Sequence, residues 1–310
     1  MRTELTDTTS SKINRALLEA RRAIGSPTTG LVLTLVVVTD EENAYDAVRA
    51  ASEASREHPC RIIAVIKRTS RGSHKLRATR LDAELRVGSD AGTGETMLLR
   101  LHGELTGQAG SVVLPLLVPD APVVAWWPTD APADLAKDSL GALAQRRITD
   151  AAEAADPVGV LDERAAGYQP GDTDLAWTRL TPWRALLAAA LDQKPLPVTG
   201  ATVESEPDNA SAELLARWLE DRLGTPVARV ASEGPVITRV ALQTTDGEIR
   251  IDRPAGALAT LMLPGSPDRK VALKIRSGAE LISEELRRLD ADVTYGSALR
   301  RRPLQAALSA

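Results

Sequence analysis

Residues 171–192, GDTDLAWTRLTPWRALLAAALD, place acidic, aromatic and basic side chains close together at the start of a helical pattern. Asp172 and Asp174 stand two residues apart. Two carboxylates at this spacing suit general acid–base catalysis or the binding of a magnesium ion. Arginines that could neutralise them are also near in the sequence: Arg146, Arg147, Arg179 and Arg184. The interpretations are an ion-paired scaffold, which we favour, a metal site, and direct contact with a partner.

Tryptophans accompany these charges. Four of the five in the chain fall in its middle: Trp126, Trp127, Trp177 and Trp183. Large aromatic side chains commonly fill protein cores, with the indole N–H hydrogen-bonded. Tryptophan and arginine are also enriched in the hot spots of binding interfaces, where carboxylate–guanidinium pairs give orientation and specificity. The block therefore predicts either a core or a contact surface for another macromolecule.

The motifs of common enzyme classes are missing from the sequence. The three histidines, at 58, 74 and 102, have no zinc-site spacing. The chain has no Gly-Lys pair, hence no Walker A loop, and no G-x-S-x-G segment of a serine hydrolase. GTGETM at 92–97 begins like a dinucleotide-binding loop, but it lacks the third glycine and leads into a strand pattern. We predict no catalytic residue, no cofactor and no metal site.

The single cysteine, Cys60, cannot form an internal disulfide, which fits a reducing compartment. It follows a proline at the start of an apolar strand pattern, where we expect a buried and unreactive thiol. His58, two residues away, leaves a nucleophilic dyad as the alternative.

Composition and charge narrow the class of protein. The chain has 310 residues, with 43% hydrophobic and 26% charged side chains, as is ordinary for a globular protein. Its net charge of −4 argues against a general nucleic-acid binder. The longest apolar run, at 31–38, is far shorter than the roughly 20 residues of a membrane helix, and the N-terminus has no apolar signal region. We therefore predict a cytoplasmic protein that binds neither nucleic acid nor a membrane.

Alternating patterns in the first half of the chain predict an α/β fold. The β-branched run at 31–38 and RIIAVIK at 61–67 are typical of strands buried on both faces. Between them, Asp40 is expected to cap a helix that reaches about Arg56, giving a parallel βαβ unit. Further elements are expected as strands at 78–87, 95–103 and 122–127, and as helices at 11–23, 133–144 and 156–166. The prediction is an open, mostly parallel sheet flanked by helices.

The second half predicts a smaller α+β domain. A helix begins at Thr181, and the proline-containing segment 193–200 is the predicted linker. Asp246-Gly247 predicts a hairpin turn, and 271–275 a strand with Val271, Leu273 and Ile275 pointing inward. Ser277 and Glu280 form a capping box for the last helix. The predicted domains are 1–192, which carries the Trp/Arg/Asp block, and 201–310.

Long segments of the chain resemble one known family. GETMLLRLHGEL (94–105), SVVLPLLVPDAPVVAWWP (111–128), RRITD (146–150) and residues 171–192 are similar to the OpcA-type glucose-6-phosphate dehydrogenase assembly proteins of actinobacteria and cyanobacteria. The resemblance implies a non-enzymatic partner that binds glucose-6-phosphate dehydrogenase and promotes its assembly into the active form. The cyanobacterial relatives are tied to thioredoxin control through cysteines. A chain with Cys60 alone has no internal dithiol, so that control is not transferred.

The resemblance also marks the residues of the expected partner-binding surface: Trp126, Trp127, Arg146, Arg147, Asp150, Asp172, Asp174, Trp177, Arg179, Trp183 and Arg184. One alternative is a regulatory protein or enzyme that binds a sugar phosphate, since arginine grips phosphate bidentately and an indole stacks on a sugar face. Another is a polar interface between domains.

Overall fold

The computed structural model describes residues 1–25, 30–67, 79–88, 94–193, 195–234, 236–254 and 257–301. The chain divides into two compact units. Unit 1 consists of Met1–Thr149 and Gly278–Ala291, and unit 2 of Asp150–Ser277 and Asp292–Ala310. The sequence predicts a linker between two domains at 193–200. In the structure, a strand of unit 2 begins within this segment, at Val198, and Lys194 lies outside the described residues.

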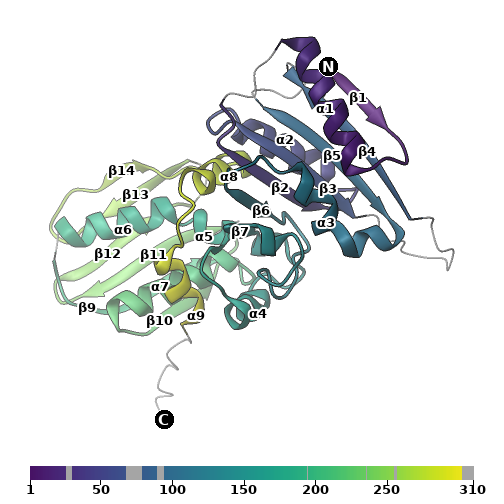
Figure 1. Cartoon of the computed structure of the whole chain (residues 1–310). Helices are drawn as coiled ribbons and strands as arrows, with labels where there is room; N and C mark the ends of the chain where they lie inside the picture. The colour runs from purple at the N-terminus through teal and green to yellow at the C-terminus, as the bar shows by residue number, and fades with distance from the viewer. Residues whose placement is uncertain are drawn as a thin grey trace. The chain divides into compact units, whose positions relative to one another are not determined.

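Strands of a mixed sheet form the centre of unit 1 (Figure 1). Among the described residues of this unit the strand order is β1-β4-β5-β3-β2-β6-β7. The strands are β1 (Arg2–Leu5), β2 (Leu33–Thr39), β3 (Cys60–Lys67), β4 (Arg80–Val87), β5 (Glu95–His102), β6 (Val123–Trp126) and β7 (Arg146–Thr149). The pairs from β5 to β7 are parallel, whereas β1 and β4 pair antiparallel at one edge. The predicted mostly parallel α/β architecture is confirmed.

Helices cover this sheet because its central strands are apolar on both faces. All residues of β2 are buried. Ile13 and Leu17 pack in one core with Val36 and Val38, which lie on one face because strand side chains alternate. The unit contains α1 (Ser10–Ile24), α2 (Ala44–Ala54), α3 (Ala109–Val113) and α8 (Gly278–Arg287), with 3-10 turns η2 (Gly103–Gln108), η3 (Leu114–Leu116) and η4 (Gly141–Leu143).

The helix predicted after Asp40 is present but starts later than expected, and the helix predicted at 133–144 is wrong, because aspartates form local turns at both places. The carboxylate of Asp40 accepts the backbone N–H of Asn43 at 2.8 Å, so α2 begins only at Ala44. The helix predicted at 133–144 is replaced by turns that end in η4. There Asp138 accepts the N–H of Leu140 at 2.9 Å, and such side-chain bonds compete with helical ones.

Unit 2 is built on a second sheet, with strand order β10-β9-β11-β12-β13-β14. Its strands are β9 (Val198–Ser205), β10 (Val227–Ala231), β11 (Ile237–Thr244), β12 (Gly247–Asp252), β13 (Leu258–Met262) and β14 (Arg269–Ala272). The other elements are η5 (Ala151–Glu153), β8 (Asp172–Asp174), α4 (Gly159–Gly167), α5 (Leu175–Thr178), α6 (Thr181–Gln193), α7 (Ala210–Leu223) and α9 (Val293–Arg300). The predicted α+β class and the hairpin at Asp246-Gly247 are confirmed.

The end of the chain departs from the prediction. β14 stops at Ala272, and the side chain of Ile275, expected inside, is 59% exposed. A helix, α8, does begin after Ser277 as predicted, but it is not the last one, because α9 follows it. Asp292 starts α9 by accepting the N–H groups of Thr294 and Tyr295, both at 2.9 Å. Residues 89–93, which include the start of the GTGETM segment, and the residues from 302 onward lie outside the described residues.

Candidate functional site

The predicted partner-binding residues divide between the two units. Trp126, Trp127, Arg146 and Arg147 belong to unit 1, and the remaining seven belong to unit 2. The four tryptophan side chains are buried in the cores, with residue exposures between 1% and 4%. The aromatic groups of the block are therefore interior, as the core interpretation expects.

In unit 1 the predicted residues hold strand β7 and the segment after β6 in place. The Arg146 guanidinium donates through Nε to Glu285 at 3.0 Å and through Nη1 to the carbonyl of Asp290 at 2.7 Å. Arg147 donates to the carbonyl of Ala144 at 2.9 Å. The indole of Trp127 lies against Gly141, where an added Cβ would stand 3.3 Å from its Cη2 and 1.8 Å from the carbonyl oxygen of Leu135. These contacts are structural.

The carboxylates of the block in unit 2 hold backbone and guanidinium groups. Asp174 is fully buried, caps α5 through Ala176 N at 2.8 Å and also accepts Ala151 N at 3.0 Å. Asp172 accepts Gln169 N at 2.7 Å. Across the described residues, no group of three or more His, Cys, Asp or Glu side chains is arranged to hold a metal ion. The carboxylates thus serve as caps and ion-pair partners.

Arg179 joins this scaffold to the surface. It forms a two-pronged ion pair with Asp150, with Nη–Oδ distances of 2.6 and 2.7 Å. Burial works against the guanidinium charge, but the hydrogen bond to Asp150 and the nearby carboxylates outweigh it and raise the pKa of Arg179. Its side chain is 29% exposed, so part of this fixed arginine reaches the surface.

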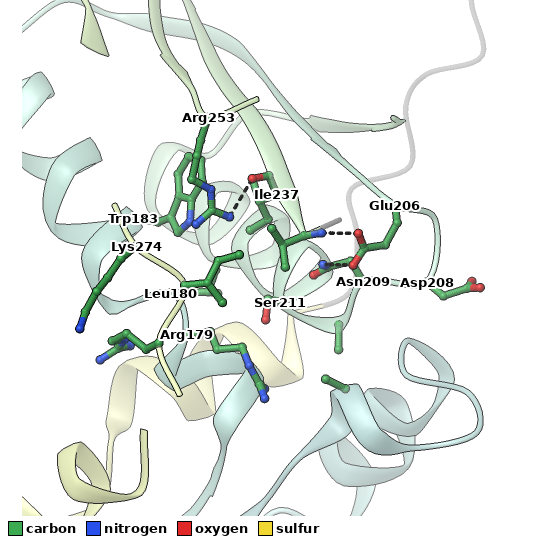
Figure 2. A pocket seen from close by; sticks show the side chains of 15 residues that line it. Arg179, Leu180, Trp183, Glu206, Asp208, Asn209, Ser211, Ile237, Arg253 and Lys274 are labelled. Atoms are coloured by element: carbon green, nitrogen blue, oxygen red, sulfur yellow. Dashed lines mark hydrogen bonds between the residues drawn. The ribbon is translucent and has the colours of Figure 1, made fainter. Parts of the chain in front are cut away.

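A pocket of about 160 Å³ lies beside Arg179 in unit 2 (Figure 2). Leu180, Trp183 and Ile237 give it an apolar wall. The Arg253 guanidinium stacks over the Trp183 ring, 5.0 Å from its centroid, and donates to the carbonyl of Ile237 at 2.9 Å. The described residues that line it include four cations and two carboxylates: Arg179, Arg253, Lys274, Arg276, Glu206 and Asp208.

The sequence did not indicate most of the residues that line this pocket. Only Arg179 and Trp183 were predicted. The other lining groups come from η5, from Leu180, from the start of α7 and the loop before it, from the start of β11, and from the segments that follow β12 and β14. Val236 lines it with φ of +66°, a backbone conformation that is strained for a β-branched residue. Its N–H donates to Glu206, which also accepts from Asn209 at 2.8 Å. Backbone strain in the wall of a pocket is common at functional sites. The sequence contains no pattern that predicts this conformation of Val236.

Cys60 is excluded as a nucleophile. Its side chain is fully buried, and burial raises the pKa of the thiol to about 12. The reactive thiolate is therefore scarce at neutral and mildly alkaline pH. We expect a disulfide reagent such as DTNB to leave the native protein unlabelled and to react with one thiol per chain after unfolding in guanidinium chloride. Rapid labelling of the native protein would contradict this assignment.

None of the described helices has the length and apolarity that a membrane-spanning helix needs. Comparison with solved structures gives an oxidoreductase from Sinorhizobium meliloti, with a TM-score of 0.43, 9% identity, and 86% of each chain covered. It also gives an NAD binding oxidoreductase from Klebsiella pneumoniae, with a TM-score of 0.38, 9% identity, and 86% of this chain and 94% of the other covered. Likenesses this weak carry no argument about activity. A comparison with curated proteins gives no match.

Two family models match consecutive parts of the chain. Both describe a glucose-6-phosphate dehydrogenase subunit: the model of its N-terminal domain matches residues 51–166, and the model of its C-terminal domain matches residues 170–299. Together they span most of the sequence and parts of both units. The chain therefore belongs to the OpcA family of glucose-6-phosphate dehydrogenase assembly proteins.

Proposed function

We propose that this protein is a non-catalytic assembly factor that binds glucose-6-phosphate dehydrogenase and favours its active form, in support of the oxidative pentose phosphate pathway in the cytoplasm. The match of both family models supports this proposal most strongly. The mechanism is a population shift, in which the protein binds the active arrangement of the dehydrogenase better than the inactive one. A difference in binding free energy of about 1–3 kcal/mol changes the balance about 5- to 150-fold.

We place part of the contact at the rim of the unit 2 pocket. Arg179 offers a guanidinium held by Asp150, and Ile275 offers an exposed apolar side chain beside Lys274. An oriented arginine next to an apolar group is a composition typical of binding hot spots. Trp177 and Trp183 act beneath this surface, as rigid packing that positions the arginines.

This surface gives the first test of the proposal. Ile275→Asp introduces a charge into the rim without disturbing the core, so we expect it to weaken binding to the dehydrogenase at least tenfold, as the loss of a contact of about 1.4 kcal/mol does. Binding is measured by pulldown and light scattering, and activation by dehydrogenase turnover. Leu258→Asp, at a side chain that is 60% exposed and does not line the pocket, is the matched control. Equal activation by both variants would place the contact elsewhere.

The pocket favours a second candidate function, the binding of a sugar phosphate. Arg179 is paired with Asp150, but the other three cations still exceed the two carboxylates of the lining, which suits an anion, and the wall containing Trp183 suits a sugar face. A thermal-shift titration with glucose 6-phosphate, in the absence of the dehydrogenase, separates the two functions. A shift that Lys274→Ala abolishes and Lys270→Ala, on exposed β14, retains would support the ligand. Activation without any such shift supports direct contact.

A further inference from the structure

A second pocket, of about 290 Å³, lies at the carboxyl ends of three parallel strands in unit 1. Thr39 and Asp40 line it at the end of β2, Lys67 at the end of β3, and the segment from Trp127 to Pro132 after β6. Of its described lining residues, Trp127 alone belongs to the predicted partner-binding surface, and the unit 2 pocket shares none of them.

The position of this pocket is the one that open α/β sheets use for ligands. From β2 the chain continues to β3 on one side, and it later returns to place β6 on the other side of β2. The strand order therefore reverses between β2 and β6. In such sheets, ligands bind outside the carboxyl ends of the strands at this switch point.

Two buried polar groups in the lining have no hydrogen-bond partner among the described residues. They are the indole Nε1 of Trp127, whose residue is 1% exposed, and the hydroxyl of Thr39, whose residue is 6% exposed. Buried polar atoms are nearly always paired, by protein or by bound molecules. Both atoms have almost no accessible surface in the free protein, so a ligand in the pocket would supply the missing partners after the two side chains turn toward it.

The charges of the lining argue against a phosphate or a nucleotide. Asp40, Asp130 and Asp138 carry three negative charges against the single positive charge of Lys67, whose Nζ is 3.9 Å from Asp138. Residues 40–42, which follow β2, are Asp-Glu-Glu, where a dinucleotide site has a glycine-rich phosphate loop. Lys67 in turn disfavours a cationic amine. An uncharged ligand fits best.

The same lining offers both donors and acceptors. Lys67 and the Trp127 indole donate, the aspartates accept, and the Thr39 hydroxyl does either. A hydroxyl group is the uncharged partner that both donates and accepts. Small-molecule pockets begin at about 300 Å³, which suits a molecule of monosaccharide size. We propose that this pocket binds an uncharged polyhydroxy compound, a sugar or a sugar alcohol, independently of the proposed dehydrogenase contact.

The indole N–H signals of the full-length protein test this proposal by NMR. Glucose, ribose, xylitol and myo-inositol are each titrated to about 10 mM, which largely saturates a site with a Kd of about 1 mM. We expect at least one of them to move the Trp127 Nε1–H signal, assigned with Trp127→Phe, and inorganic phosphate not to move it.

Thr39→Val removes one of the two unpaired groups at nearly constant shape. It is expected to weaken the interaction about threefold to tenfold, the effect of one lost hydrogen bond. Thr96→Val is the matched control, because Thr96 is also buried with a hydroxyl unpaired among the described residues but lies outside the pocket. The proposal is overturned if no polyol moves the signal, if phosphate does, or if both variants bind alike. Dehydrogenase activation is not measured here, so the two proposals stand or fall separately.

Discussion

Glu285→Ala is expected to lower the free energy of unfolding by about 3–5 kcal/mol, because it leaves the buried Arg146 guanidinium without its carboxylate. Both side chains are about 95% buried, and they join β7 to the helix α8 from the other end of the sequence. The carbonyl of Asp290 alone cannot neutralise the arginine. The loss is measured by guanidinium denaturation, followed with probes that report on unit 1.

Two further variants distinguish this effect from the loss of any ion pair. Arg49→Ala breaks the exposed pair between Arg49 and Asp46 on α2, and is expected to cost less than about 1 kcal/mol. The double variant Arg146→Met/Glu285→Leu removes both buried charges, and should be clearly more stable than the sum of the single effects implies. If Glu285→Ala proves as mild as Arg49→Ala, the pair does not hold α8 in unit 1.

The division into units shows where sequence reasoning reaches its limit. Strands β2 and β3 and helix α1 were predictable, because burial and periodicity over a few residues determine them. The return of 278–291 to unit 1 was not, since Arg146 and Glu285 are 139 residues apart. A local pattern contains the Ser277-to-Glu280 sequence at the start of α8, but not the surface on which the helix packs.

The same limit applies to the candidate site. Residue types alone could not decide whether the tryptophans form a core or a contact surface, because both uses favour indoles. The deciding contacts are long-range: Trp177 donates to Asp292, 115 residues away, and Trp183 stacks with Arg253. Ion pairing with the nearby arginines was the favoured interpretation of Asp172 and Asp174. Both carboxylates accept backbone N–H groups, and the carboxylate that pairs with Arg179 is that of Asp150.

Trp177→Ala is the second change with a large expected effect, a loss of about 3–5 kcal/mol of unfolding free energy. The indole is 1% exposed, packs 5.8 Å from the Tyr295 ring and carries the Arg184 guanidinium 3.7 Å above it. Its Nε1 donates to Asp292 at 2.8 Å, which ties α5 to the start of α9. The alanine variant loses the packing, the stacked cation and this bond together.

Trp177→Phe separates the packing from the hydrogen bond. An aromatic ring smaller than the indole remains, and Asp292 keeps the N–H groups of Thr294 and Tyr295, so we expect a smaller loss of about 1–2 kcal/mol. Trp218→Phe, at a half-buried tryptophan of α7, is the matched control and should change stability by less than about 1 kcal/mol. Thermal and denaturant unfolding measure all three variants.

Trp177→Phe also decides how the tryptophan serves the proposed activation of glucose-6-phosphate dehydrogenase. If the indole acts from the core, the phenylalanine variant retains activation wherever it is folded, and the alanine variant loses activation only in step with its folded fraction. A well-folded phenylalanine variant that no longer activates would mean that Trp177 contacts the dehydrogenase itself. Since the indole is buried in the free protein, unit 2 would then have to open around α5 on binding.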